Sequence, residues 1–325
     1  MTAVIQVKPG IGDVIWHLPF VRAIAAAAPD GQVTFFAPPT SAARDLLAAE
    51  PRVAATVYFQ HAGSEWQRGI NLVRLVALLR RRTCNRSGSS TAPSGRRWQR
   101  RSPAFRNGSG WDSARKAPSS PMTALARSIF TNHPIDWLRA LMAAMKVPLS
   151  STEPNLQVPI ALLGAVGESF AQFARPWIAI GIGASHPDKD WSDATWSEFL
   201  RALRAPGTVF LVGGPANEAR AEKFISVSSS GQIVNACGLR LIEAAALLRL
   251  TDLFIGPSSG PLNLAAAGGT EAFGLFGSTP VLTYSRFIRA IVPKDGPSPG
   301  GMARISPAQV LERIAPHLSR RKAPA

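Results

Sequence analysis

The sequence predicts an α/β protein built from two doubly wound domains, each with a mostly parallel sheet, that face each other across a cleft. Three observations support this. Short apolar, β-branched runs alternate with helical patterns, the alternation occurs twice, and a stretch typical of a linker, Pro148–Pro154, separates the two series. The chain of 325 residues, 46% of them hydrophobic, is long enough for two cores of ordinary size.

The first series begins with an apolar run (Val4, Ile5, Val7) that predicts a buried parallel strand. A glycine turn follows, and then a long apolar helix that Asp13 opens and that runs to about Ala28. The rest of the series is predicted as strands near 32–38 and from 53, and helices from 41, over about 71–82 and from 134.

The second series consists of buried strands that alternate with helices. The predicted strands are Trp177–Gly183, Thr208–Gly214 and the runs QIVNA, DLFIG and AFGLFG; the predicted helices are near 194–204, 218–226, 241–250, 261–267 and 307–318. This pattern predicts an N-terminal domain over 1–150, a C-terminal domain over 155–305, and a final helix and tail over 306–325.

Composition excludes several classes of protein. No stretch approaches the roughly 20 apolar residues of a membrane span, and no basic region followed by an apolar block indicates a secretory signal. Two cysteines, Cys84 and Cys237, are too few for a disulfide framework or a multi-thiolate metal site. We therefore expect a cytoplasmic protein.

The net charge of +16 suggests an anionic partner, but its distribution weakens that suggestion. Between Arg80 and Lys116 there are eleven Lys or Arg residues and one acid, Asp112, so ten of the sixteen net charges come from this segment. Within it, the stretch from Thr83 to about Ala117 is rich in Ser, Arg and Gly and has almost no apolar periodicity. It is a disordered basic insertion, a functional basic loop, or a frame-slipped stretch of the gene.

The genetic code tests the third interpretation. Joining the last base of each codon to the first two of the next, from the Arg86–Ser87 junction to Asp112, permits the translation IWILDRTVRPALAAALAGIPERIGLG. This text predicts a strand, an alanine-rich helix and a glycine loop, which is the βα unit that the first series lacks. Our hypothesis is a pair of compensating frameshifts, one near Thr83 and one between about Ala117 and Ala124. Under it the basic segment is no evidence for nucleic-acid binding, for which the chain also lacks a recognition fold.

The glycine turn after the first strand is the first candidate site. Asp13 is either a helix cap or a general base that takes a proton from an attacking hydroxyl. Gly10 and Gly12 form the tight turn before the helix, and Lys8 at the strand end either holds an anion or is solvated. His17, one turn further on, is expected to pack rather than to catalyse.

Three further candidates follow strands of the second series. In GASHPDKDW, Ser185 lies in a small-residue loop, and Lys189 either reaches a phosphate or faces solvent. In GPSSGPLNLAAAGG, Ser258, Ser259 and Gly260 precede a helix whose first position we assign to Pro261, a helix-start pattern that suits an anion. In GGPANEARAEKF, Glu218 either accepts ribose hydroxyls or complements the helix dipole.

Taken together, these motifs resemble glycosyltransferase family 9, the ADP-heptose:lipopolysaccharide heptosyltransferases. The matching text is KPGIGDVIWHLP, GAS-x3-K-x-W, GGP-x2-E and S-S-G-P-x-N-L-A-A-A followed by LFGSTP, in that order, and AGIPERIGLG from the alternate frame is also similar. The resemblance implies a GT-B fold of two Rossmann-like domains, with the acceptor on the first and the nucleotide sugar on the second, and an inverting reaction without metal or cofactor.

By motif match, the resemblance implies that Asp13 is the general base and that Lys8, Gly10 and Gly12 lie on the acceptor side. The implied donor-binding residues are Ser185, Lys189, Glu218, Ser258, Ser259, Gly260 and Asn263. Two positions depart from the family pattern: Ser258 stands where the family usually has Asp, and Asn263 where it usually has His. The absent Asp is expected to bind sugar hydroxyls, so both the sugar and the activity are open.

The expected function is therefore transfer of a sugar, with heptose as the first expectation, from an ADP-sugar to a lipopolysaccharide core or related glycan. The alternative is a catalytically impaired relative that only binds nucleotide or glycan. The expected partners are a nucleotide-sugar donor and an anionic, membrane-borne acceptor, and not nucleic acid. A moderately basic protein of this kind can dock peripherally on the inner face of the inner membrane.

Overall fold

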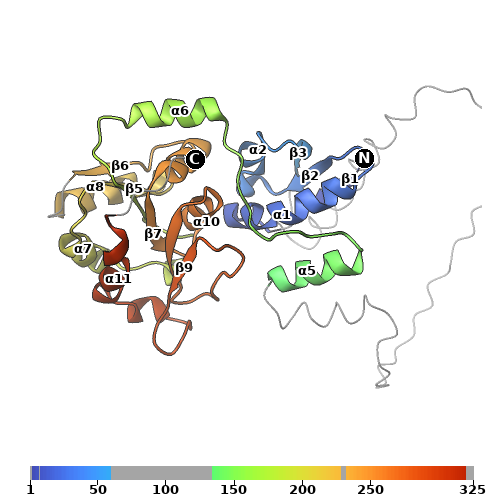
Figure 1. Ribbon diagram of the computed structural model, residues 1–325. Helices are drawn as coiled ribbons and strands as arrows, with labels where there is room; N and C mark the ends of the chain where they lie inside the picture. The colour runs from blue at the N-terminus through green and yellow to red at the C-terminus, as the bar shows by residue number, and fades with distance from the viewer. Residues whose placement is uncertain (1, 7, 60–133, 228–231, 320–325) are drawn as a thin grey trace, which may run out of the picture. The chain divides into compact units, whose positions relative to one another are not determined.

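A computed structural model describes residues 2–6, 8–59, 134–227 and 232–319 (Figure 1). The chain forms two compact units. One comprises Thr2–His61 together with Leu149–Ala325, and the other spans Ala62–Pro148. The described part of the second unit includes the helix α5 (Pro134–Ala144), which confirms the helix predicted from Pro134. None of the helices in the described ranges is long and apolar enough to cross a membrane.

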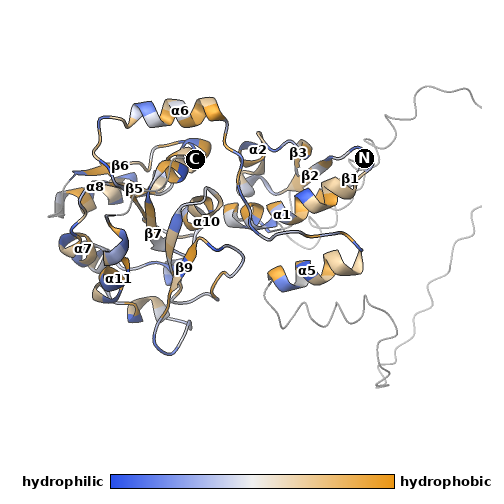
Figure 2. Cartoon of the chain, in the orientation of Figure 1, coloured by the Kyte–Doolittle hydropathy of each residue, from blue (hydrophilic) through white to orange (hydrophobic). Residues whose placement is uncertain are grey.

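The N-terminal part of the large unit contains a parallel sheet whose described strands have the order β1-β2-β3. These strands are β1 (Thr2–Ile5), β2 (Val33–Ala37) and β3 (Val53–Tyr58), and the connecting helices are α1 (Ile11–Ala27), a 3₁₀ turn (Pro39–Ser41) and α2 (Ala43–Leu46). Helix α1 is largely hydrophobic (Figure 2), because apolar residues occupy most of its faces, and eight of its residues are buried.

The second sheet is entirely parallel, with the order β6-β5-β4-β7-β8-β9. Its strands are β4 (Trp177–Gly181), β5 (Thr208–Val212), β6 (Gln232–Asn235), β7 (Leu253–Pro257), β8 (Glu271–Leu275) and β9 (Ile288–Ile291). The first strand, β4, lies inside the sheet with β5 and β7 as neighbours, and the chain reverses its direction of travel across the sheet there. Ligands bind open α/β sheets at such a switch point.

Helices cover both faces of this sheet (Figure 1). On one face α7 packs against α8 and α11, and on the other α9 packs against α6 and α10. Their bounds are α6 (Ile160–Ser169), α7 (Asp193–Ala202), α8 (Glu218–Val227), α9 (Leu241–Leu250), α10 (Gly260–Ala267) and α11 (Pro307–Ile314). Buried apolar residues of α1, α9 and α10 belong to one cluster, so the core beneath α10 is shared with α1.

The segment between Pro148 and α6 is irregular and longer than the predicted stretch Pro148–Pro154, and polar contacts hold it in place. The Arg22 guanidinium donates to the carbonyls of Pro154 (2.7 Å) and Asn155 (2.8 Å) and pairs with Glu50 (2.5 Å). Thr152 donates to the carbonyl of Tyr284 (3.1 Å). The predicted linker is therefore anchored to α1 at one point and to the loop before β9 at another.

Several sequence predictions need correction. The first strand is not buried: its residues alternate between half-buried and exposed, and 43% of Ile5 is exposed, because among the described residues β1 has a neighbouring strand only at β2. Helix α1 begins at Ile11, two residues before Asp13. The helix predicted from Ser41 shrinks to one turn, α2, because Ala42 adopts a left-handed conformation with φ 49°.

Other elements were not predicted at all: α6 and β9 have no counterpart in the sequence analysis. The predicted helix over 71–82, the segment from Thr83 to about Ala117 and Cys84 lie outside the described residues. The domain limits at 150, 155 and 306 stay predictions.

Candidate functional site

The N-terminal ends of α1 and α10 lie against each other. A Cβ built on Gly260 would lie 3.6 Å from the Cβ of Ile11, which is ordinary contact, whereas one built on Gly12 would lie only 2.7 Å from Nδ2 of Asn263. The missing side chain of Gly12 therefore permits this approach. Because each helix presents free N–H groups and a positive dipole end at its start, the two ends together favour an anion.

Asp13 occupies the third position of α1 and is half-buried. Its Oδ2 accepts the N–H of Gly10 at 3.1 Å, and its own N–H donates to the Gly10 carbonyl at 3.1 Å, so the side chain caps its helix. No described residue donates to Oδ1. The structure thus shows the capping role and leaves one carboxylate oxygen for a proton transfer; the general-base role stays a prediction.

His17 and Lys8 flank this turn. His17 Nδ1 donates to the carbonyl of Asp13, and its ring stacks on Trp16 with centroids 4.4 Å apart. Burial lowers the pKa of His17 below its ordinary value of 6.5, despite the raising effects of Asp13. Lys8 is exposed, with its ammonium 5.4 Å from the centre of the Trp16 ring. A neutral His17 with a bonded Nδ1–H fits the expected packing role.

Helix α10 begins at Gly260 with Ser259 as its N-cap, one position earlier than the assignment of Pro261 to the first turn. The Ser259 side chain makes no capping hydrogen bond, and its buried Oγ has no partner among the described residues. Asn263, 5% exposed, donates from Nδ2 to the Ser259 carbonyl (2.7 Å) and accepts the hydroxyl of Tyr284 on Oδ1. These hydrogen bonds hold the start of α10 in place, whereas the Ser259 Oγ at the same helix end has no hydrogen-bond partner among the described residues.

The remaining predicted donor residues follow β4 and β5. Ser185 and Lys189 lie in the loop after β4, where Gly183 has φ 93°, a conformation that favours glycine. Ser185 is exposed, and Lys189 is half-buried at the end of a 3₁₀ turn (Pro187–Lys189), with no carboxylate partner in the described part of the chain. Glu218, the first residue of α8, is exposed.

The carboxylate of Glu218 approaches the end of β6. A Cβ built on Gly238 would lie 3.0 Å from its Oε1. Burial, assisted by the charges of Glu218 and Glu222, raises the pKa of the neighbouring Cys237 thiol to about 11. Cys237 is therefore a protonated, inert thiol. Among the described residues, no group of three or more His, Cys, Asp or Glu side chains is placed to hold a metal.

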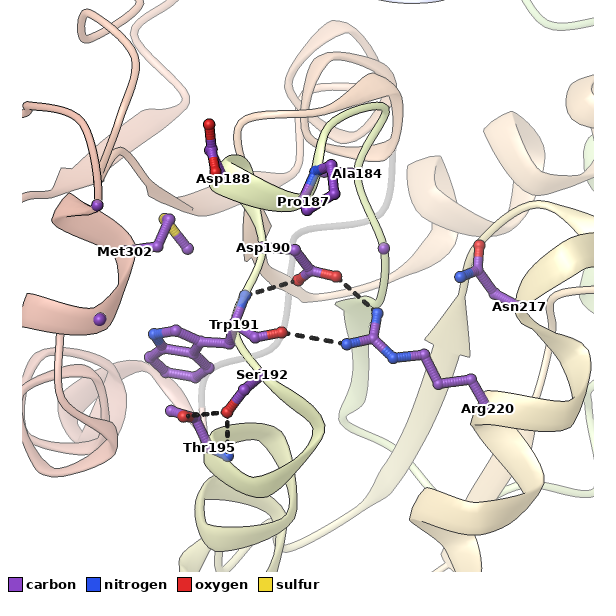
Figure 3. Close-up of a pocket in the computed structure, with 13 residues that line it drawn as sticks. Ala184, Pro187, Asp188, Asp190, Trp191, Ser192, Thr195, Asn217, Arg220 and Met302 are labelled. Carbon is purple, nitrogen blue, oxygen red and sulfur yellow. Dashed lines mark hydrogen bonds and ion pairs between the residues drawn. The ribbon is translucent and has the colours of Figure 1, made fainter.

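A pocket of about 600 Å³ adjoins the loop after β4 (Figure 3). Two of the residues that line it, Arg220 and Asp190, form an ion pair with 2.6 Å between nitrogen and oxygen. The Arg220 guanidinium also donates to Asp193 (2.8 Å) and to the carbonyl of Trp191 (3.2 Å). Asp190 also accepts the backbone N–H of Trp191 at 2.9 Å. The pocket is lined by Gly183 and Ala184 of the predicted loop, but not by Ser185, Lys189 or Glu218. Its paired charges make it less suited to a diphosphate than the helix ends.

The topology explains which motifs come together. Strands β5, β4 and β7 are adjacent, and Glu218, the Ser185–Lys189 loop and Ser258–Gly260 follow their carboxyl ends in turn. The contact between α1 and α10 adds the turn with Gly10, Gly12 and Asp13. Two residues of structural importance were not predicted. Tyr284, which orients Asn263, lies in none of the motifs. Arg220 lies within GGPANEARAEKF, but its partners in 190–193 are distant in the sequence, so nothing local marked it as the residue that joins α8 to that segment.

The profile of Glycosyltransferase family 9 (heptosyltransferase) matches residues 104–290, more than half of the chain. The match begins inside the segment from Thr83 to about Ala117 and ends beyond α10, so the turn around Asp13 lies outside it. No curated protein matches the sequence.

Solved structures of such enzymes share the fold. ADP-heptose lps heptosyltransferase II of E. coli superimposes with a TM-score of 0.63 at 19% identity over 98% of each chain. A family 9 glycosyl transferase of Veillonella parvula superimposes with a TM-score of 0.65 at 15% identity, over 98% of this chain and 96% of the other. The E. coli heptosyltransferase WaaC with ADP-2-deoxy-2-fluoro heptose superimposes with a TM-score of 0.54 at 13% identity, over 97% of this chain and 99% of the other.

The α/β architecture with two parallel sheets is thus that of a GT-B glycosyltransferase, as the sequence predicted. Together with the profile match over residues 104–290, it shows that this chain belongs to glycosyltransferase family 9, the heptosyltransferases.

Proposed function

We propose that this protein transfers a sugar, with heptose as the first candidate, from an ADP-sugar to a lipopolysaccharide core or related glycan, with inversion and without a metal. The observation that carries the proposal is the contact between the N-terminal ends of α1 and α10. This contact brings a carboxylate, Asp13, close to a helix end suited to a diphosphate.

In this proposal the diphosphate lies at the start of α10, where backbone N–H groups of Ser259 and Gly260 and the unbonded Oγ of Ser259 are available. Lys189 adds a positive charge from the neighbouring strand, and Ser185 donates from the same loop. A departing diphosphate without a divalent cation needs donors of this kind, because its charge grows as the glycosidic bond breaks. Glu218 accepts ribose hydroxyls, and Ser258 and Asn263 lie beside the sugar.

On the acceptor side, Oδ1 of Asp13 takes the proton of the attacking hydroxyl while Oδ2 keeps the Gly10 N–H. The hydrogen bond to Gly10 fixes the direction of the carboxylate, so the base is positioned by its own helix cap. Gly10 and Gly12 lie on the acceptor side as the turn that lets Asp13 and Asn263 approach, because a Cβ on either glycine would lie 2.7 Å from one of those side chains. Lys8 is available for an anionic group of the acceptor.

Turnover of ADP-heptose with a lipopolysaccharide core acceptor tests the proposal. Asp13→Asn keeps the acceptor oxygen for the cap but removes the base, so turnover should fall about 10²- to 10⁴-fold with ADP affinity nearly unchanged. The matched control is Asp45→Asn, which alters another first-turn acid, exposed at the start of α2, and should leave turnover intact. Full turnover by the Asp13→Asn variant would refute the role of Asp13 as general base.

Two observations favour a second candidate, a relative that binds nucleotide or glycan without transfer. Ser258 replaces the acid expected at the sugar, and β1, the strand that leads to Asp13, is half exposed. ADP binding by calorimetry together with absent turnover of every ADP-sugar offered would select this candidate. Turnover of ADP-heptose would exclude it.

We further propose a cytoplasmic site of action, with peripheral contact to the inner face of the inner membrane. The basic balance of the chain supports attraction to anionic lipid and to an anionic acceptor. Co-sedimentation with vesicles containing anionic lipid should decrease as salt rises, because the attraction is electrostatic. Binding that is equal for neutral and anionic vesicles would contradict it.

A further inference from the structure

The first turn of α10 offers few backbone donors, so the direction of each one matters. The helix begins at Gly260, and the next residue, Pro261, has no N–H group. Gly260 therefore provides the first N–H of the helix, and no described residue accepts it. The attraction of this helix end for an anion thus depends strongly on where the Gly260 N–H points.

The direction of the Gly260 N–H is set together with that of the Ser259 carbonyl, because both belong to one peptide group. This group is planar and trans, so its N–H and its C=O point in opposite directions. The usual helical hydrogen bond to the Ser259 carbonyl is long, at 3.4 Å from the backbone nitrogen of Asn263. The side-chain Nδ2 of Asn263 lies much closer, at 2.7 Å. The Asn263 side chain therefore holds this peptide group more tightly than the helix does.

Tyr284 in turn fixes the side chain of Asn263. The Tyr284 hydroxyl donates to Oδ1 of Asn263, and the two residues are only 3% and 5% exposed. Burial, assisted by the charge of Glu153, raises the pKa of Tyr284, so the phenol keeps the proton that it donates. A reversed amide would set Oδ1 against the Ser259 carbonyl, acceptor against acceptor. Only one orientation of the Asn263 amide therefore satisfies both partners.

The loop that carries Tyr284 is itself held by the segment before α6. Thr152 donates to the Tyr284 carbonyl at 3.1 Å. The Glu153 carboxylate accepts the hydroxyl of Ser285 and, at 3.1 Å, the N–H of Arg286. Tyr284 is thus fixed through its main chain as well as through its hydroxyl, so it can hold the Asn263 amide in one position.

We propose that Tyr284 is a positioning residue of the donor site, which acts through Asn263 to direct the Gly260 N–H toward the diphosphate. This inference rests on the proposed function and adds to it a residue that stands behind Asn263 in the hydrogen-bond chain. Without the phenol hydroxyl, Oδ1 of Asn263 would be buried and without its donor. The amide would then turn, and the peptide group between Ser259 and Gly260 would turn with it.

Calorimetric titration of the full chain with ADP tests this proposal. Tyr284→Phe keeps the ring and removes the hydroxyl, and the Kd for ADP should rise about tenfold, because a hydrogen bond to a charged group is misaligned. The matched control is Thr208→Val, which removes a buried hydroxyl that donates to the Ala174 carbonyl (2.8 Å) at the amino end of β5. Both variants should lower the melting temperature, but the control should leave the Kd unchanged. An unchanged Kd for Tyr284→Phe, or an equal rise in both variants, would overturn the proposal.

A double-mutant cycle shows whether Tyr284 acts through Asn263. Asn263→Ala should raise the Kd for ADP at least as far as Tyr284→Phe does. In the chain that already carries Asn263→Ala, Tyr284→Phe should change the Kd less than about twofold, because its path to Gly260 is gone. Independent effects that multiply would contradict the proposal. If Tyr284→Phe does not fold, Asn263→Ala is the deciding variant, and an unchanged Kd for ADP would overturn the proposal there.

Failure of this inference can be told apart from failure of the proposed function. If the unaltered chain binds ADP but turns over no ADP-sugar, transfer is refuted, and the Kd values still decide the role of Tyr284. If the unaltered chain turns over ADP-heptose and Tyr284→Phe binds ADP equally well, only the positioning role is refuted. A chain that binds no ADP would overturn both.

Discussion

The substitution Gly12→Ala tests the contact between α1 and α10. The new Cβ would lie 2.7 Å from Nδ2 and 3.1 Å from Cγ of Asn263. That side chain cannot move aside freely, because Ser259 and Tyr284 hold its two polar atoms. Overpacking of this kind costs about 1–3 kcal/mol, and replacing a helical glycine by alanine returns up to about 1 kcal/mol. The expected net loss is about 1–2 kcal/mol.

A thermal melt measures this loss, and Gly164→Ala is the matched control. Gly164 lies within α6, is exposed, and a Cβ built on it meets nothing within 4 Å. For a chain of this size the melting temperature should fall by about 2–6 °C for Gly12→Ala and rise by about 1–3 °C for Gly164→Ala. If both variants raise it equally, α1 and α10 do not meet as described.

Three further predictions concern side chains around the site. Asp13→Ala should lower the free energy of unfolding by about 1 kcal/mol and Asp13→Asn by less, because the amide oxygen still caps the helix; chemical denaturation measures both. The pKa of His17 is lowered in the folded protein, so as the pH falls below 6.5 the unfolded chain binds a proton at this residue more readily than the folded one, and the free energy of unfolding decreases. Chemical denaturation between pH 7 and 5.5 should show this decrease, and His17→Gln should reduce it. Arg220→Ala should cost about 2 kcal/mol, because Asp190 stays largely buried without its partner; a loss no larger than that of an exposed pair would contradict this.

Elements with strong local patterns could be predicted from the sequence. The buried runs that became β4, β5 and β7 have the apolar, β-branched composition of strands covered on both faces, and Pro134 marks the start of α5. The order of the motifs then placed Glu218, Lys189 and the start of α10 at one sheet edge, because parallel strands end on the same side.

What depended on tertiary context could not be predicted. Helix α2 is shortened by the left-handed conformation of Ala42, which no turn signal in the sequence announces. Ile5 is 43% exposed, and among the described residues β1 has a neighbouring strand only at β2, which the composition of the strand does not reveal. Tyr284 lies 21 residues beyond Asn263 in the chain, so its hydrogen bond to that side chain is a consequence of folding alone.

The position of the diphosphate in a crystal of the protein with ADP tests the central claim most directly. The account predicts phosphate oxygens within about 3.2 Å of the first N–H groups of α10 and of Ser259 Oγ, with the Lys189 ammonium beside them. Phosphates bound instead in the pocket lined by Asp190 and Arg220, or elsewhere away from the start of α10, would contradict it.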